Sequence, residues 1–305
     1  MKYFNLAGEQ VSRVIQGCMR ISRIDQQAVD ALLKTDLECG INFFDHSNVY
    51  GGGSCETKFG QFLKDNPGTR EKMFIQTKCG LRNRMYDSSK EQIVSCVDKS
   101  LSRFGIEYID FLLIHRPDML CDPEEVADAF TTLQEQGKVR HFGVSNHNPL
   151  QIELLKKYLG DKIAISVDQL QFSLIHTGML DCGANVNVLN DAACSRDGHI
   201  LDYTRLNDIT IQPWSPFQGK QDEGIFIDNP NYPELNEKLK EIADRYGITP
   251  TGLAIAWILR HPAKMQPIIG TTNLDRVRQI AAAADVTITH DEWYELYKST
   301  GKTLP

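Results

Sequence analysis

Apolar residues along the chain follow two patterns that take turns. Short, largely apolar runs predict buried strands, and the longer stretches between them repeat apolar residues at helical spacing. The predicted strands lie at residues 13–16, 41–44, 73–77, 111–114, 141–144, 165–168, 209–212 and 266–269. The stretches 25–39 and 91–104 each gather their apolar residues on one face, as in a helix packed on a core. Predicted strands and helices therefore alternate along the chain.

Residues typical of helix boundaries agree with this alternation. Ser54, Ser88 and Pro123 stand where helices are expected to start, and Glu91 follows Ser88 by three positions, as in a capping box. Glycines stand where helices are expected to stop, at Gly40, Gly105, Gly137 and Gly247. About eight strand–helix units favour a closed barrel over an open doubly wound sheet. We expect an α/β protein, a (β/α)8 or TIM barrel, with residues 1–305 in one domain.

Two segments interrupt the pattern. Residues 178–205 are polar and predict no clear element, and residues 218–233 form a loop rich in Asp, Asn, Gly and Pro. Loops of this length are usually functional lids or disordered segments. Neither has the composition of a linker, so we expect no domain boundary there.

Composition narrows the class of protein. Lysine and arginine number 33 against 40 aspartate and glutamate, and the net charge of −7 argues against general binding to nucleic acid or anionic membranes. No apolar run approaches the ~18 residues of a membrane span, and the first residues lack the apolar core of a secretory signal. The eight cysteines are scattered without a metal-ligand spacing. We expect free thiols in a reducing cytoplasm and no bound metal.

Several catalytic and nucleotide-binding motifs are missing. No Gly-x-Gly-x-x-Gly follows the first strand, and the run Gly51–Gly53 lacks the third spaced glycine. The phosphate-binding loop of ATP and GTP hydrolases is also missing. The segment 143–147 resembles a nucleophile elbow, but His147 stands where that turn requires glycine.

The predicted strand ends carry polar, aromatic or small residues, where a barrel places its chemistry. Asp45, Tyr50, Lys78 and His115 follow three adjacent strands. A lysine ammonium lowers the pKa of a neighbouring tyrosine, a carboxylate keeps that ammonium charged, and a histidine can hydrogen-bond a carbonyl oxygen. Each residue alone is more often structural, so their joint placement predicts the site.

Seven segments, in order along the chain, resemble the aldo-keto reductase family. They are residues 44–56, 77–78, 110–118, 137–146, 169–173, 214–217 and 268–273. The His-Arg-Pro-Asp sequence at residues 115–118 is most similar to bacterial oxidoreductases of that family. The resemblance implies a barrel whose bottom is closed by a short N-terminal β-hairpin, here at residues 2–4 and 10–12. It also implies NADPH (NADP+) bound without a dinucleotide-binding sheet, and hydride transfer to an aldehyde or ketone.

The resemblance assigns roles to individual residues. Tyr50 would be the general acid, tuned by Lys78 and Asp45, and His115 would orient the carbonyl. The cofactor would be bound by Ser145, Asn146 and Gln169 at the carboxamide, Trp214 on the nicotinamide ring, Ser215, Phe217 and Gly219 at the pyrophosphate, and Gly270, Thr271, Thr272, Arg276 and Gln279 at the adenosine end. These residue types suit those contacts, because amides and hydroxyls pair with a carboxamide and an aromatic face holds a flat ring.

Departures from the family pattern leave several points open. Gly270 stands where many members carry a lysine for the 2′-phosphate, so NADPH preference depends mainly on Arg276, which can grip a phosphate bidentately. Asn273 is expected to cap a helix over residues 274–284. Arg116 either binds a substrate carboxylate or forms a structural ion pair, and we expect the ion pair. Residues 178–205 and 218–233 match no family pattern, which leaves the small-molecule carbonyl substrate open.

Two other functions remain alternatives. One is a regulatory protein that keeps the fold and the cofactor while turnover is incidental, similar to potassium-channel β subunits. The other is an unrelated barrel lyase or isomerase, but such enzymes often need a phosphate site or metal ligands that the spacing does not show. We expect a monomer or a weak homo-oligomer.

Overall fold

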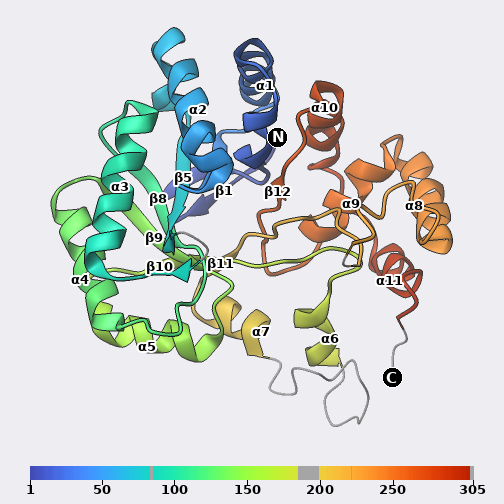
Figure 1. Ribbon diagram of the computed structural model, residues 1–305. Coiled ribbons are helices and arrows are strands. Elements are labelled where there is room, and N and C mark those ends of the chain that lie inside the picture. The colour runs from blue at the N-terminus through green and yellow to red at the C-terminus, as the bar shows by residue number, and fades with distance from the viewer. Residues whose placement is uncertain (83–84, 185–198, 221, 303–305) are drawn as a thin grey trace.

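A parallel sheet forms the centre of the computed structural model, which describes residues 1–82, 85–184, 199–220 and 222–302 (Figure 1). Its strands run in the order β11-β10-β9-β8-β5-β4-β3-β12, and all neighbouring pairs are parallel. The strands are β3 (Ile15–Gly17), β4 (Phe43–Asp45), β5 (Phe74–Cys79), β8 (Ile109–Ile114), β9 (Val139–Ser145), β10 (Ile165–Gln169), β11 (Thr210–Ile211) and β12 (Ile268–Ile269). Each overlaps a strand predicted from the sequence.

Backbone hydrogen bonds join the two edges of this sheet. The amide of Gln266 donates to the carbonyl oxygen of Ile211 at 3.0 Å, and the amide of Ile268 donates to that of Pro213 at 2.9 Å. The segment that ends in β12 therefore lies beside β11, and the sheet closes on itself without an exposed edge. This confirms the predicted (β/α)8 barrel.

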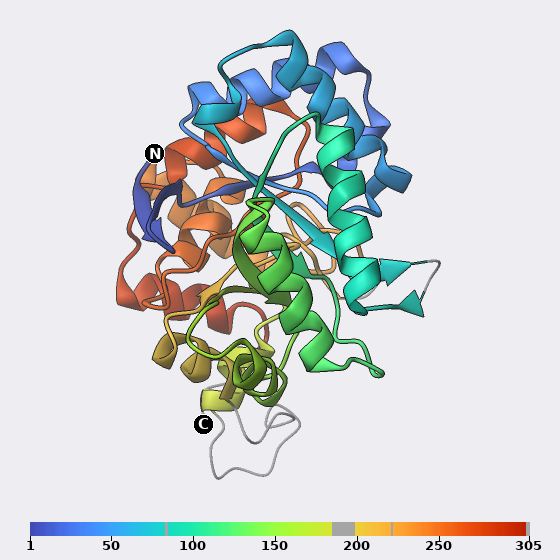
Figure 2. The same cartoon turned by 90° about the vertical axis from the view of Figure 1, so that its left-hand side faces the viewer.

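Helices cover the outside of the barrel (Figures 1 and 2). They are α1 (Gln26–Glu38), α2 (Ser54–Asp65), α3 (Lys90–Phe104), α4 (Pro123–Glu135), α5 (Pro149–Leu159), α6 (Gly178–Ala184), α7 (His199–Leu206), α8 (Pro233–Tyr246), α9 (Pro250–Leu259), α10 (Leu274–Ala283) and α11 (His290–Lys298). The 3-10 helices are η1 (Cys18–Arg23), η2 (Tyr50–Gly53) and η3 (Arg70–Lys72). Apolar residues of these helices are buried against the sheet or against neighbouring helices; in α1, Val29, Leu32 and Leu33 are fully buried.

An antiparallel hairpin closes the bottom of the barrel, as expected. Its strands are β1 (Tyr3–Leu6) and β2 (Glu9–Ser12). Leu6 and Val11 of the hairpin belong to the same buried cluster as Phe43 and Phe111 inside the barrel. The amide of Ser12 donates to the side-chain oxygen of Asn42, which precedes β4, at 2.7 Å. The N-terminal ends of the strands are therefore covered, and the opposite ends remain available for a site.

The structure differs from the sequence analysis at two local points. Helix α3 is capped by Ser89, whose hydroxyl accepts from the amide of Gln92, whereas the hydroxyl of Ser88 is buried without a partner among the described residues. A second hairpin, β6 (Leu81–Arg82) with β7 (Met85–Tyr86), follows β5 and was not predicted. Of the two unassigned segments, 178–205 contains α6 and part of α7, and its residues 185–198 lie outside the described residues, as does residue 221.

None of the helices in the described ranges combines the length and the apolarity that crossing a bilayer would require.

Candidate active site

Tyr50, Lys78 and Asp45 form one hydrogen-bonded unit at the C-terminal end of the barrel. Asp45 ends β4, Lys78 lies near the end of the neighbouring β5, and Tyr50 begins η2. The Nζ of Lys78 donates to both carboxylate oxygens of Asp45 at 2.7 Å and to the carbonyl oxygen of His46 at 2.8 Å. It also donates to the hydroxyl of Tyr50 at 3.1 Å. Three of the residues predicted at adjacent strand ends are thus in direct contact.

Burial and charge together set the ionisation of this unit. Burial alone would lower the pKa of the Lys78 ammonium, but Asp45 and Tyr50 raise it, and the net pKa of Lys78 lies above its ordinary value. Burial raises the pKa of the Tyr50 hydroxyl, and the Lys78 ammonium opposes that shift without reversing it. The ammonium lowers the pKa of Tyr50, as the sequence predicts, but removal of the hydroxyl from water raises this pKa by more. Tyr50 therefore keeps its proton at neutral pH.

His115 follows β8 and faces the same unit. Its ring lies 6.1 Å from the Tyr50 ring, centroid to centroid, in an edge-on arrangement. Burial, reinforced by the charges of Lys78 and Arg116, lowers the pKa of His115 to about 3, so its imidazole is neutral near pH 7. The Nδ1 atom lies 3.1 Å from the Oγ of Ser47, which was not predicted from the sequence. When that hydroxyl donates to Nδ1, the ring proton sits on Nε2.

A chain of amide side chains holds the Asp45 carboxylate from inside the barrel. Gln76 and Gln169 each donate to its Oδ1, at 2.8 and 3.1 Å. Gln76 also donates to Gln212 at 2.7 Å, Gln212 donates to Gln266 at 3.0 Å, and Gln266 donates to a backbone carbonyl of the N-terminal hairpin at 2.8 Å. The carboxylate is therefore fixed by contacts that run through the barrel interior. Apart from Gln169, these glutamines were not predicted, because each stands inside an apolar strand sequence.

A cavity of about 310 Å³ opens beside the catalytic candidates. It is lined by ten of the residues predicted from the sequence, namely Asp45, Tyr50, His115, Ser145, Asn146, Gln169, Trp214, Ser215, Phe217 and Gly270. Lys78 lies behind Asp45 and Tyr50 rather than on the cavity wall. The cavity lining does not include the other predicted residues, Gly219, Thr271, Thr272, Arg276 and Gln279.

Hydrogen bonds fix one wall of the cavity. Asn146 has a left-handed backbone with φ of 59°, held by its amide, which donates to the carbonyl oxygen of Gln169 at 3.0 Å. The hydroxyl of Ser145 donates to the same carbonyl at 2.8 Å, and the indole of Trp214 donates to the side-chain oxygen of Asn146 at 3.3 Å. The side-chain oxygen of Gln169 has no hydrogen-bond partner among the described residues. The wall thus offers a fixed aromatic face beside a spare amide oxygen.

Arg20, which was not predicted, also lines the cavity. Its Nη1 donates to the carbonyl oxygen of Gly270 at 3.2 Å. A Cβ added at Gly270 would lie 3.9 Å from that nitrogen and near no other atom. Arg20 could have been found from the sequence by also considering the residues that follow the first barrel strand, β3. Asn273 caps α10 by accepting from the amide of Arg276 at 2.9 Å, as expected, and the Arg276 side chain is exposed on that helix.

Arg116 lines the cavity next to His115. Its guanidinium lies 5.9 Å from the centroid of the Trp214 ring. The sequence analysis favoured a structural ion pair for Arg116, but the structure shows none with any described residue. The nearby carboxylate of Asp118 instead accepts from the backbone amides of Ser88 and Leu120, at 3.0 and 2.9 Å.

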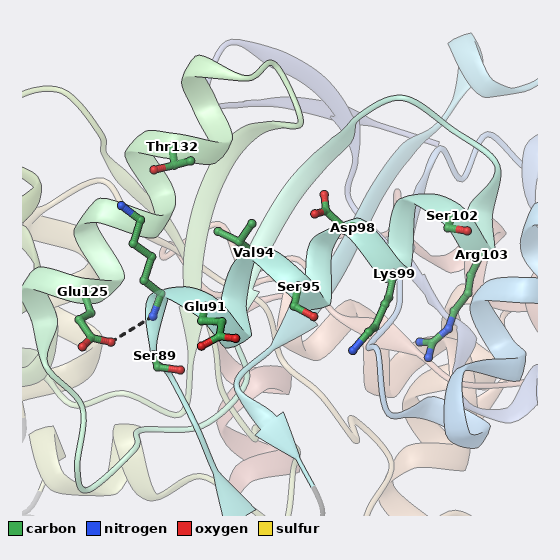
Figure 3. Close-up of a pocket in the computed structure, with 11 residues that line it drawn as sticks. Ser89, Glu91, Val94, Ser95, Asp98, Lys99, Ser102, Arg103, Glu125 and Thr132 are labelled. Carbon is green, nitrogen blue, oxygen red and sulfur yellow. Dashed lines mark hydrogen bonds between the residues drawn. The ribbon is translucent and has the colours of Figure 1, made fainter.

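A larger hollow lies elsewhere. It is an open groove of about 1130 Å³ between α3 and α4, on the outer surface of the barrel (Figure 3). Glu91, Ser95 and Asp98 of α3 line this groove, beside Ser89, which caps that helix. Larger volume therefore does not outweigh the convergence of polar groups at the smaller cavity. In the described part of the chain, no three His, Cys, Asp or Glu side chains are grouped as metal ligands.

Comparisons with known proteins agree with the fold. The model of the Aldo/keto reductase family matches residues 13–299. A 6-dehydroglucose reductase of Agrobacterium fabrum is 33% identical, with 94% of each chain covered. The oxidoreductase YdhF of Escherichia coli is 31% identical, covering 96% of this chain and 94% of that protein. A crystal structure of a thermostable aldo-keto reductase with the inhibitor epalrestat superimposes with a TM-score of 0.78 at 24% identity, covering 98% and 100% of the two chains.

A closed (β/α)8 barrel with ionisable residues at its strand ends has the architecture of a barrel enzyme. The chain belongs to the aldo/keto reductase family. It is accordingly an oxidoreductase of the kind that reduces carbonyl compounds.

Proposed function

We propose that this protein reduces aldehydes or ketones to alcohols with NADPH, and that Tyr50 is the general acid. The observation that carries the proposal is the hydrogen bond of 3.1 Å between the Tyr50 hydroxyl and the Lys78 ammonium, at the wall of a cavity that His115 also lines. The relative named 6-dehydroglucose reductase supports a small carbonyl compound as the substrate.

The residues around the cavity fit a nicotinamide cofactor. The spare side-chain oxygen of Gln169 can accept from a carboxamide, and the hydrogen-bonded indole of Trp214 presents a flat face to a ring. Arg20 beside the open space over Gly270 can pair with a phosphate, and Arg276 at the capped start of α10 suits the 2′-phosphate. When bound, NADPH supplies the hydride for the carbonyl carbon.

Each catalytic candidate then has one task. Tyr50 gives its proton to the carbonyl oxygen, and the adjacent Lys78 ammonium stabilises the tyrosinate that forms. Asp45, at 2.7 Å, keeps Lys78 charged in a fully buried position. Neutral His115, when Ser47 donates to its Nδ1 and its proton is on Nε2, donates a hydrogen bond that directs the carbonyl oxygen toward Tyr50.

Free thiols support a cytoplasmic location, which we also propose. Six cysteines in the described residues are free, and four of them are buried. Reduced, buried thiols are typical of proteins in a reducing compartment.

The direct test combines NADPH binding with NADPH consumption on a panel of aldehydes and ketones. We expect NADPH binding to quench tryptophan fluorescence. We also expect the bound cofactor to be oxidised only when a carbonyl compound is present. Tight binding without turnover on any carbonyl would favour the regulatory alternative. A protein that does not bind NADPH would contradict the proposal entirely.

A further inference from the structure

Arg116 is a cation inside the candidate active site, and it has no acidic partner among the described residues. It follows His115 directly, and both side chains line the cavity with Tyr50. Among the described residues, the Arg116 side chain forms no ion pair and no hydrogen bond. Its guanidinium makes a cation–π contact with the Trp214 ring, at 5.9 Å from the ring centroid. A cation–π contact at that distance stabilises a charge only weakly.

Two other partly buried arginines in this structure are paired with carboxylates. Arg70 contacts Asp110 at 2.8 Å, and Arg103 contacts Glu56 at 3.0 Å. Each gains a carboxylate that offsets the cost of removing the guanidinium from water. Asp118, the acid closest in sequence to Arg116, accepts from backbone amides, and none of the described carboxylates pairs with Arg116.

The charges around the cavity leave an excess of positive charge. The carboxylate of Asp45 is paired with Lys78 at 2.7 Å, and His115 is neutral because its pKa is lowered to about 3. Arg20 and Arg116 remain as cations on the wall, although the whole chain carries a net charge of −7. A concave site with this charge concentrates anions.

The two arginines contact different residues of the cavity wall. Arg20 lies at Gly270, where the cofactor phosphates are proposed to bind, whereas Arg116 lies beside His115 and Trp214, where the carbonyl is proposed to sit. A ligand anion near Arg116 therefore belongs to the substrate rather than to the cofactor phosphates.

We propose that Arg116 binds an anionic group of the substrate, so that the preferred substrates are carbonyl compounds that carry a carboxylate or a phosphate. This inference rests on the proposed reductase function. The planar guanidinium can donate two parallel hydrogen bonds to either oxyanion, which a neutral substrate of the same shape cannot match.

The test uses pairs of probes that differ in charge. The carboxylate pair is para-formylbenzoate and its neutral isostere para-formylbenzamide; the phosphate pair is glyceraldehyde phosphate and glyceraldehyde. Both kcat/KM with NADPH and binding to the protein–NADP+ complex are measured for wild type, Arg116→Gln, Arg116→Lys and the control Arg82→Gln. Arg82 is half exposed, pairs with Asp87 and does not line the cavity, so its replacement removes a charge without touching the site.

Arg116→Gln should lower kcat/KM and affinity for the anionic member of at least one pair by roughly ten- to hundredfold, as expected for a lost charge-assisted hydrogen bond. The neutral member and NADPH affinity should change little. For Arg116→Lys, kcat/KM and affinity for the anionic probe should lie between those of wild type and Arg116→Gln, because lysine keeps the charge but cannot donate two parallel hydrogen bonds. Arg82→Gln should resemble wild type.

The inference is wrong if wild type shows no preference for either anionic probe, or if the preference survives in Arg116→Gln. It is also wrong if NADPH affinity falls in parallel with turnover on both probes, because Arg116 would then serve the cofactor. Binding of the anion that depends on Arg116 in the NADP+ complex, without turnover of any probe with NADPH, would support the anion site and refute the reductase function.

Discussion

Replacing Asp45 with Asn should expose how strongly the buried ammonium of Lys78 depends on its carboxylate. Lys78 is fully buried, and Asp45 is the one carboxylate of the described residues within ion-pair distance of it. The Asp45 Oδ1 accepts from Lys78, Gln76 and Gln169, and its Oδ2 accepts from Lys78. In Asp45→Asn, either orientation of the amide places its NH2 group opposite a hydrogen-bond donor, so at least one of these hydrogen bonds is lost.

The expected magnitude follows from the cost of an unpaired buried charge. Breaking a buried ion pair by removing one partner costs about 3–5 kcal/mol, a large part of the ~5–15 kcal/mol that typically stabilises a protein. Lys78→Met should cost a similar amount, because it leaves the carboxylate uncompensated. The double variant removes both charges, so it should lose less than the two single losses together, by up to about 3 kcal/mol.

Urea unfolding of wild type, both single variants and the double variant measures this coupling. Losses that add to within ~0.5 kcal/mol would refute the argument, because they would show that the charges do not depend on each other. The pH dependence gives a second check. Without Asp45, burial would lower the pKa of Lys78 below that of the unfolded chain, so the deficit of Asp45→Asn should shrink as the pH is raised from about 7 to about 9.

Three further predictions follow from the site and its surroundings. His46 is fully buried edge-on against Phe59 and Phe104, and burial lowers its pKa to about 3 from the usual 6.5. The cost of protonating buried His46 therefore destabilises the wild-type fold as the pH falls below 6.5. In urea unfolding, the stability of His46→Phe relative to wild type should be about 2 kcal/mol higher at pH ~5 than at pH ~7.5. The same pH dependence in both proteins would contradict this. Arg276→Ala should weaken NADPH binding far more than NADH binding in a fluorescence titration, whereas equal losses would place the 2′-phosphate elsewhere. Because burial raises the pKa of Tyr50 and lowers that of His115 to about 3, kcat/KM for reduction should stay flat from about pH 5 to about pH 9; a step near the usual histidine pKa would show that His115 titrates.

Much of the fold could be predicted from the sequence because strands buried on both faces appear as continuous apolar runs. The helix stops at Gly105 and Gly247 were also predictable, since both glycines adopt the left-handed conformation that ends a helix. The cap of α3 was misplaced by one residue because Ser88 and Ser89 are adjacent, and only backbone geometry decides between them.

The site was predictable where a residue follows a strand directly, as for Asp45 and His115. Interior contacts were not, because Gln76 and Gln212 stand within apolar runs and meet only when the barrel closes. The net direction of the Tyr50 pKa shift could not be predicted for a similar reason. Sequence shows that an ammonium is near, but not how completely the hydroxyl is removed from water. The absence of an ion pair at Arg116 likewise depends on where Asp118 points.

The most direct test of the account compares Tyr50→Phe with wild type for NADPH-dependent reduction of reactive aldehydes and for NADPH affinity. The variant removes the hydroxyl that contacts Lys78 at 3.1 Å and keeps the ring. We predict that kcat falls by at least about 100-fold, the usual contribution of a general acid, while NADPH affinity stays nearly unchanged. Turnover equal to that of wild type would contradict the assignment of Tyr50 as the proton donor.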